Sequence, residues 1–250
     1  AVPFTNKAAR EMKERVAELM STRQASARGL MVSTFHTLGL NILRRDGKSL
    51  GYRPGFSIFD AQDSLAVFRD LMGRDFAADS EHAEQVQWQI SEWKNQLILP
   101  AKDMQIAEAG TQMAAAKVYP LYTAALQAYN AVDFDDLILK PVVLFRENPE
   151  VLKKWQARIH YLLVDEYQDL NKAQISLIRT LASGNGQVFA VGDDDQLIYG
   201  WRFAETHNIL GFHDRMPDSP LTKTYILNTN YRCAASIVNS SRRLIDHNSL

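Results

Sequence analysis

Short apolar runs that each end abruptly in a polar segment are the feature that most constrains the fold of this chain. Four such runs occupy residues 30–33, 161–164, 188–191 and 225–227. Runs of this length are typical of strands that are buried in a parallel sheet.

Helical periodicity lies between these runs. Residues 7–20 carry the apolar stripe Met12, Val16, Leu19 and Met20. Residues 173–181 carry the stripe Ile175, Leu177, Ile178 and Leu181. Alternation of strands with helices predicts an α/β fold built on an open parallel sheet. Ligands bind such sheets beyond the carboxyl ends of the strands, so we expect the site where the polar segments lie.

Residues 60–117 have a different pattern, without a convincing strand. Helical periodicity covers residues 61–72 and 81–97, and a third helical stretch covers residues 112–130. We therefore expect an all-helical insertion at 60–117.

Charge gives a weak indication of the partner. Lys and Arg number 28 against 29 Asp and Glu, so the formal net charge of −1 provides no bulk attraction to nucleic acid or to a membrane. Residues 1–53 nevertheless carry ten basic residues against four acidic ones. This basic part suits a phosphate backbone and suits solvated helix faces equally well.

Cysteine usage and hydropathy bear on the compartment. Cys233 is the single cysteine, which excludes an intrachain disulfide and fits a reducing cytosol. No stretch has the roughly eighteen apolar residues of a membrane span, and the first residues lack a signal-peptide core. We expect a cytoplasmic protein without a membrane partner. Because the chain opens with Ala1 and its first residues resemble the end of a strand, we also expect a fragment of a longer protein.

Asp165 and Glu166 directly follow the apolar run at 161–164. One such carboxylate can hold Mg²⁺ while its neighbour polarises the water that attacks a γ-phosphate. Taken alone, an acidic pair after a strand more often begins the next helix, where the helix dipole favours it.

A second acidic cluster, Asp193-Asp194-Asp195, follows the run at 188–191. Three acids in a row suggest a metal-dependent nuclease, but no histidine or further carboxylate stands at ligand spacing. The polar and aromatic residues that follow suit a phosphate sensor beside a base-stacking platform, although a lone tryptophan is more often structural. They are Gln196, Tyr199, Trp201 and Arg202.

Tyr231 and Arg232 place an aromatic face beside a planar cation, which suits an adenine ring and a phosphate. Without further context, a packed tyrosine beside a surface arginine is the simpler explanation. Gly47-Lys48-Ser49 resembles the end of a Walker A loop, but Ile42 replaces the required upstream glycine. The sequence therefore contains no P-loop.

In combination, these segments resemble the superfamily 1 DNA helicases of the UvrD, Rep and PcrA type. The sequence of residues 35–40 favours the Rep branch. The matching segments are 4–9 (motif Ia), 34–37 (motif Ib), 133–137 (the Asp-Phe-Asp-Asp-Leu segment), 165–169 (motif II), 191–204 (motif III) and 230–232 (motif IV).

The resemblance implies an ATP- and Mg²⁺-dependent motor that moves 3′ to 5′ along single-stranded DNA. Its fold would be the RecA-like P-loop NTPase sheet with an all-helical inserted subdomain. The first motor domain would comprise residues 1–59, which lack Walker A, and 118–235. Residues 60–117 would be the insertion, and 236–250 the start of a second motor domain.

The resemblance also implies roles for single residues. Asp165 would bind magnesium, Glu166 would activate water, Gln196 would sense the γ-phosphate, Tyr231 would stack on adenine and Arg232 would neutralise transition-state charge. The residues implied to contact DNA are Phe4, Asn6, His36, Phe134, Tyr199, Trp201 and Arg202. Single strands and duplex junctions are the expected partners, with replication or repair proteins in addition.

Several positions depart from the family pattern, and Phe203 is the most disruptive. Glycine is usual there, where it permits close approach or an unusual φ, so Phe203 would displace Trp201. Leu197 replaces a usual serine. Without a phosphate cradle, the 250 residues alone are expected to be inactive. The alternatives are a degenerate, noncatalytic module that binds DNA or protein, and the motor part of a helicase-nuclease.

Overall fold

The computed structural model describes residues 1–3, 5–22, 29–76, 80–100, 110–184, 186–200, 203–204, 207–212 and 222–247. Three predicted DNA-binding residues, Phe4, Trp201 and Arg202, lie outside these ranges. In the described part, none of the helices is long and apolar enough to cross a membrane.

Two short parallel sheets form within the described residues. Strand β3 (Tyr161–Val164) pairs with β4 (Gln187–Ala190), and β1 (Ser57–Phe59) pairs with β2 (Ala131–Asp133). Val2 adds a parallel bridge to Val164 on the other side of β3. The fold is therefore mixed, with helices and parallel strands, as predicted.

The run at 30–33 does not form the predicted strand but lies beside the first residues of the chain. The amide of Ser33 donates to the carbonyl of Ala1 at 3.1 Å, and the amino group of Ala1 donates to the carbonyl of Met31 at 2.6 Å. This segment extends the β3–β4 sheet irregularly past Val2.

The described helices cover one face of β3. Leu162 and Val164 share a buried core with residues of four helices: α2 (Phe35–Asp46), α7 (Asp136–Glu147), α8 (Pro149–Gln156) and α9 (Lys172–Ala182). Leu163 and Phe189 point to the other face and are exposed, Phe189 to 59%. The strands are therefore buried on one face and exposed on the other within the described part of the chain.

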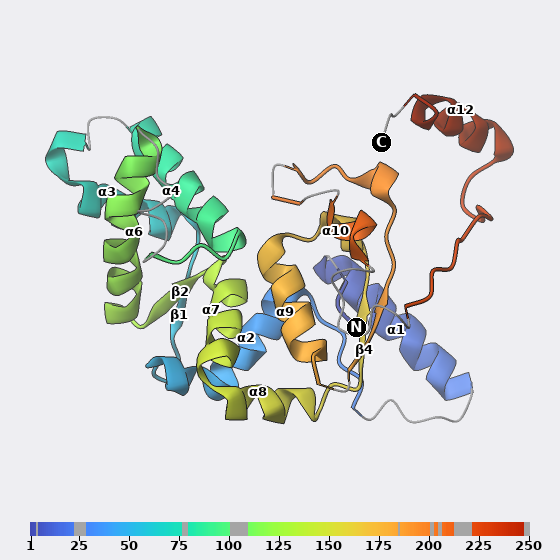
Figure 1. The fold of residues 1–250 in the computed structure, drawn as a ribbon, viewed down its shortest axis with the longest axis horizontal. Coiled ribbons are helices and arrows are strands. Elements are labelled where there is room, and N and C mark those ends of the chain that lie inside the picture. The colour runs from blue at the N-terminus through green and yellow to red at the C-terminus, as the bar shows by residue number, and fades with distance from the viewer. Residues whose placement is uncertain are drawn as a thin grey trace.

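The predicted helical region forms a unit with its own core at one end of the molecule (Figure 1). Its helices are α3 (Ala61–Phe76), α4 (Ser80–Asn95) and α6 (Thr111–Ala128). The rings of Phe68 and Tyr122 stack at a centroid distance of 4.1 Å inside it. Since α6 runs through residue 117, the predicted limit of the insertion falls within a helix, and the division into domains stays a prediction.

Helix α2 (Phe35–Asp46) packs closely against α7. Thr34 caps α2 by accepting a hydrogen bond from the amide of Thr37. A Cβ atom on Gly39 would lie only 1.7 Å from the carbonyl oxygen of Leu137, so glycine is required at this crossing. Pro141, inside α7, has no N–H to donate to that carbonyl, which leaves it open to the approach of α2.

The remaining elements connect or flank these units. They are α1 (Asn6–Thr22), η1 (Gly47–Leu50), η2 (Tyr167–Asp169), η3 (Asp194–Gln196), α10 (His207–Leu210) and α12 (Ala235–Ile245). Helices α1 and α9 confirm the two helices predicted from apolar stripes. The stripe of α1 is not buried, however, because Ala9 is the one buried residue of that helix.

Residues 222–230 have no regular structure, so the strand predicted at 225–227 is wrong. Tyr225, Ile226 and Leu227 are all exposed, Leu227 to 86%. A strand needs a neighbour to accept its ladder of hydrogen bonds, and no described segment pairs with this one. Figure 1 shows α12, which follows this segment, at the opposite end of the molecule from α3, α4 and α6.

Candidate functional site

The acidic pair after β3 occupies a strained turn. The amide of Asp165 donates to the carbonyl of Val2 at 3.3 Å, and Glu166 has a φ of 50°. A residue other than glycine with positive φ is uncommon, and such residues cluster at functional sites. The amide of Tyr167 then donates to the carbonyl of Val191 at 2.9 Å, which fixes the turn to the end of β4.

Gln168 joins the segments after the two strands. Its side chain is buried, with 1% exposed. The amide nitrogen Nε2 donates to Oε2 of Glu166 at 2.8 Å, while Oε1 accepts from the backbone N–H of Asp193 at 3.1 Å. An uncharged amide side chain can donate from its nitrogen and accept at its oxygen at the same time. Sequence reasoning missed Gln168, although its place two residues after Glu166 was visible.

Gly192 allows that junction to close. A Cβ atom at this position would lie 2.7 Å from Oε1 of Gln168 and 2.7 Å from the side chain of Ile209. A larger residue at position 192 would therefore displace the side chain of Gln168 or of Ile209.

Gln196 is connected to the same junction. Its Nε2 donates to Oδ2 of Asp193 at 2.7 Å, and Oδ1 of Asp193 accepts from the amide of Asp195 at 3.2 Å. The structure thus links Glu166, Gln168, Asp193 and Gln196 in one series of hydrogen bonds. Two of the predicted catalytic residues, Glu166 and Gln196, are brought together.

The surroundings of Asp165 and Asp169 disfavour the ionised form of their carboxyl groups. Burial, and then the charge of Glu166, raises the pKa of Asp165 above its usual range and that of Asp169 to about 6. The buried Oδ1 of Asp169 has no hydrogen-bond partner among the described residues. A set of carboxylate oxygens with excess negative charge is the donor set that Mg²⁺ prefers, so these residues fit that ion.

The cluster Asp193-Asp194-Asp195 also has its carboxylate oxygens close together, within 4.8 Å of one another. Both oxygens of Asp193 already accept hydrogen bonds inside the segment. Asp193 therefore stabilises the loop and holds Gln196.

His36 and Phe134, both predicted to contact DNA, lie in contact. Their ring centroids are 5.9 Å apart with an interplanar angle of 63°. Both are exposed, Phe134 to 55%. His36 stands in the first turn of α2 and Phe134 in the turn between β2 and α7. The close crossing of these two helices at Gly39 positions this aromatic pair.

The structure also describes two other residues that were predicted to contact DNA. Asn6 is exposed at the start of α1, and Tyr199 is half-buried just after η3. Their roles stay predictions.

None of the described hydrogen bonds joins Tyr231 or Arg232 to Glu166 or Gln196. Tyr231 is 94% exposed. The described hydrogen bonds of this segment are local, since Oδ1 of Asn230 accepts from the amides of Arg232 and Cys233 at 2.9 and 2.8 Å. The predicted roles of Tyr231 and Arg232 are therefore without support from the described contacts.

Phe203 has a φ of 65°, the left-handed backbone that glycine adopts without strain. The physical reason for expecting glycine here is therefore visible in the backbone. Its ring contacts that of Trp88 on α4, with centroids 5.4 Å apart and an interplanar angle of 53°. Whether Phe203 displaces Trp201 concerns a residue outside the described part of the chain.

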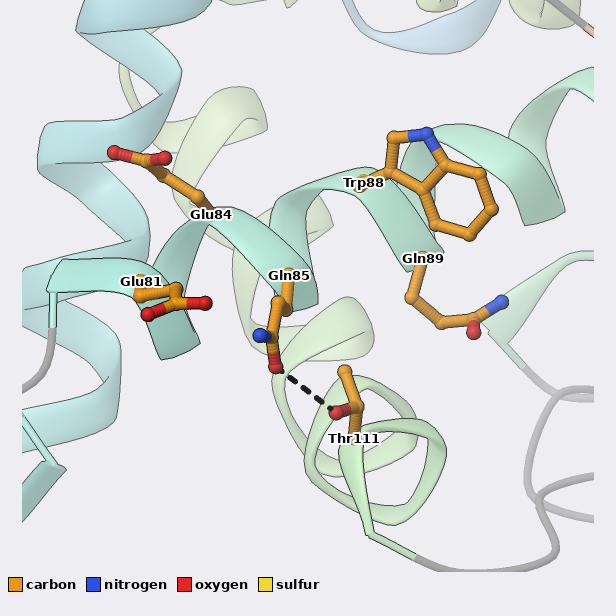
Figure 2. Close-up of a pocket in the computed structure, with 6 residues that line it drawn as sticks. All are labelled: Glu81, Glu84, Gln85, Trp88, Gln89 and Thr111. Atoms are coloured by element: carbon orange, nitrogen blue, oxygen red, sulfur yellow. Dashed lines mark hydrogen bonds between the residues drawn. The ribbon is translucent and has the colours of Figure 1, made fainter. Parts of the chain in front are cut away.

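A surface pocket beside Trp88 holds none of the predicted site residues. Figure 2 shows its lining along α4 and the start of α6, with the hydroxyl of Thr111 donating to Oε1 of Gln85 at 3.5 Å. The pocket is lined by Glu81, Glu84, Gln85, Trp88, Gln89 and Thr111. It is thus separate from the junction around Gln168.

Parallel strands whose following loops carry linked carboxylate and amide side chains define an α/β ligand-binding domain. The particular family follows from comparison with known proteins. Residues 1–217 match the UvrD/REP helicase N-terminal domain, and the chain belongs to this family.

Similar proteins match along the whole chain. The ATP-dependent DNA helicase Rep of Escherichia coli (strain K12) is 44% identical over 248 residues, covering 99% of this chain and 36% of that protein. The ATP-dependent DNA helicase PcrA of Leuconostoc citreum is 40% identical over 251 residues, covering 100% of this chain and 33% of its own length. The PcrA of Staphylococcus aureus (strain Mu50) is 41% identical with the same coverage. The chain spans about a third of the length of these relatives.

Proposed function

We propose that this chain is the RecA-like first motor domain, with its helical insertion, of an ATP-dependent 3′-to-5′ DNA translocase or helicase. Residues 1–59 and 118–235 would form the motor domain, 60–117 the insertion and 236–250 the start of a second motor domain. Membership of the UvrD/REP family and the names of the relatives support the activity. The observation that carries the proposal is the hydrogen-bonded series from Glu166 through Gln168 and Asp193 to Gln196.

This series suits phosphoryl transfer. Bound Mg²⁺ would supply charge neutralisation at the phosphates, and Asp165 would hold it. Glu166 would accept the proton of the attacking water, while Gln168 keeps its carboxylate in place. Gln196 would contact the γ-phosphate, and loss of that phosphate would change the hydrogen bond between Gln196 and Asp193. Tyr231 would stack on adenine, and Arg232 would neutralise charge in the transition state.

Single-stranded DNA would lie across the aromatic pair of His36 and Phe134. Each base stacked on an aromatic ring contributes roughly 1–3 kcal/mol, which lets a nearly neutral chain hold DNA. Asn6 and Tyr199 would add contacts, as would Phe4, Trp201 and Arg202. Duplex junctions and replication or repair proteins would be further partners. An enzyme that acts on chromosomal DNA would work in the cytoplasm of a bacterial cell.

The test is Glu166→Gln in the full-length protein. Loss of a general base lowers turnover by about 10²–10⁴-fold, whereas nucleotide binding should persist because the glutamine keeps the shape of the side chain. DNA-stimulated ATP hydrolysis and nucleotide affinity are measured in parallel. Glu150→Gln is the control, since Glu150 is an exposed acid that pairs with Lys153 in α8. Turnover that survives Glu166→Gln would remove Glu166 from the mechanism.

The second candidate is a noncatalytic module that binds DNA or protein. The strained backbone at Phe203, where the family pattern has glycine, favours it. A full-length wild-type protein that binds single-stranded DNA but never hydrolyses ATP would establish this candidate over the motor.

A further inference from the structure

A buried charged cluster lies beneath the turn that carries Phe134. Lys94, at the end of α4, is only 2% exposed. Its Nζ pairs with Oδ2 of Asp133 at 2.6 Å and with Oδ1 of Asp136 at 3.0 Å. The hydroxyl of Tyr122 donates to the same Oδ2 of Asp133 at 2.9 Å. Separating Lys94 from its partners would leave an uncompensated buried charge, so these side chains stay together.

Asn95, the next residue of α4, makes a second set of bonds. Its Nδ2 donates to Oδ1 of Asp135 at 2.9 Å and to the carbonyl of Ser91 at 2.8 Å. Its Oδ1 accepts from Nδ2 of Asn171 at 2.6 Å. Burial, and then the charge of Asp133, raises the pKa of Asp135 to about 6.

Asn171 connects this cluster to the catalytic turn. It caps α9 through a capping box. Oδ1 of Asn171 accepts from the backbone amide of Gln174, and Oε1 of Gln174 accepts from the backbone amide of Asn171. Asn171 stands three residues after Gln168, which holds Glu166. Hydrogen bonds therefore join Asn171 to Asp135 through Asn95, and a short stretch of backbone, from Gln168 to Asn171, connects them to the residue that holds Glu166.

We propose that Lys94, Asn95 and Asn171 are positioning residues that fix the Phe134 turn to the segment after Glu166, so that DNA contact at Phe134 alters ATP turnover at Glu166. This inference rests on the proposed function. Lys94 holds Asp133 and Asp136, Asn95 holds Asp135, and Phe134 is carried between them. Displacement of Phe134 by a base would therefore bear on Asn171 through Asn95.

A purely structural role would stabilise α4 without linking the two activities. The two roles differ in the ratio of DNA-stimulated to basal ATP turnover, measured in the full-length protein. Coupling between sites typically amounts to 5–150-fold, so a tenfold fall in that ratio is the expected order of magnitude.

Asn95→Asp is the disruptive variant, because it sets a second carboxylate against Asp135 in place of the donor. DNA stimulation should fall by about tenfold, while basal turnover and affinity for single-stranded DNA change by less than about twofold. Asn95→Asp combined with Asp135→Asn restores a donor and an acceptor with their positions exchanged. This double variant should recover the stimulation even if Asn95→Asp alone loses stability.

Asp46→Asn is the matched control. The carboxylate of Asp46 also accepts two hydrogen bonds, from Lys154 at 3.0 Å and from Trp155 at 2.8 Å. Neither of these bonds reaches the turn that carries Phe134. Its stimulation ratio should equal that of the wild type. A tenfold loss in the control, or no rescue in the double variant, would overturn the proposal.

Hydrogen exchange on the same full-length variants separates failure of this inference from failure of the proposed function. Asn95→Asp should speed amide exchange both at residues 134–137 and at residues 168–171, and the double variant should slow both again. Faster exchange at 134–137 alone would overturn the link to the catalytic turn, whatever the turnover. If both segments respond but the wild type hydrolyses no ATP, the link stands and the helicase assignment fails.

Discussion

The segments that carry Glu166 and Arg232 differ in how they are held. The turn with Glu166 is tied to Val2, to the end of β4 and to the buried Gln168. The segment with Arg232 bonds only within itself among the described residues, and its neighbour Tyr231 is almost fully exposed. Both would act on one nucleotide, yet only the first is fixed by the described part of the chain.

This difference shows where the geometry of each group comes from. A catalytic group must be held to a fraction of an ångström, which needs supporting residues that are themselves locked. Gln168 and Gly192 provide that support for Glu166. For Arg232, support would have to come from a closed state with nucleotide bound. We therefore expect substitutions in the first region to change stability and those in the second to leave it unchanged.

The largest effect on stability is expected from Gly39→Ala, at the crossing of α2 and α7. The added methyl would collide with the carbonyl oxygen of Leu137, and overpacking of this kind costs about 1–3 kcal/mol or more, beyond the roughly 1 kcal/mol that alanine gains in a helix. Denaturant unfolding measures the loss. Gly47→Ala is the control, because its methyl would meet neighbours at an ordinary 3.7 Å. Equal midpoints for the two variants would refute the close crossing.

Gln168→Met should have the next largest effect. The substitution keeps the size of the side chain but removes the donor to Glu166 and the acceptor for the amide of Asp193. Loss of both bonds should lower the free energy of unfolding by about 1–3 kcal/mol. Turnover in the full-length protein should also fall, since Glu166 loses its fixed position. Gln62→Met, at an exposed glutamine near the start of α3, should change stability by less than about 0.5 kcal/mol. If Gln168→Met behaves like that control, the first region is not held as described.

Patterns of local periodicity predicted most of the elements. The apolar stripes gave α1 and α9, the helical periodicity gave α3, α4 and α6, and two of the four apolar runs became β3 and β4. The run at 225–227 has the same composition but remains exposed. Hydrophobicity sets the tendency of a segment to be buried, whereas a ladder partner decides whether it becomes a strand.

The supporting residues of the site could not be predicted, because they depend on contacts between distant segments. Lys94 lies in an amphipathic helix, where lysine normally faces water, and its partner Asp133 is 39 residues away. Gln168 bonds to the amide of a residue 25 positions later. The motifs of the family predict which groups act, and the structure shows which groups hold Glu166.

A smaller effect should appear as a pH dependence of stability at the turn that carries Glu166. Asp169 has a pKa of about 6 in the folded protein, against about 4 in an unfolded chain. The folded state therefore binds this proton more tightly than the unfolded chain does. Protonation of Asp169 stabilises the fold below about pH 4, and this contribution is lost as the pH rises through about 6. Asp169→Asn should flatten the curve of unfolding free energy in that window. Asp135 titrates over the same range, so a residual slope should remain. An unchanged slope in Asp169→Asn would show that its carboxyl has no raised pKa.

The smallest effect on stability is expected from Tyr231→Ala in the segment that the fold leaves exposed. A side chain that is 94% exposed contributes little burial, so the free energy of unfolding should change by less than about 0.5 kcal/mol without nucleotide. If Tyr231 stacks on adenine in the closed state, the same variant should weaken ATP binding in the full-length protein, which equilibrium titration can measure. A loss of stability above about 1 kcal/mol without nucleotide would mean that Tyr231 is already packed, and the contrast with Glu166 would fail. Unchanged stability with unchanged ATP affinity would keep the contrast but remove Tyr231 from the nucleotide site.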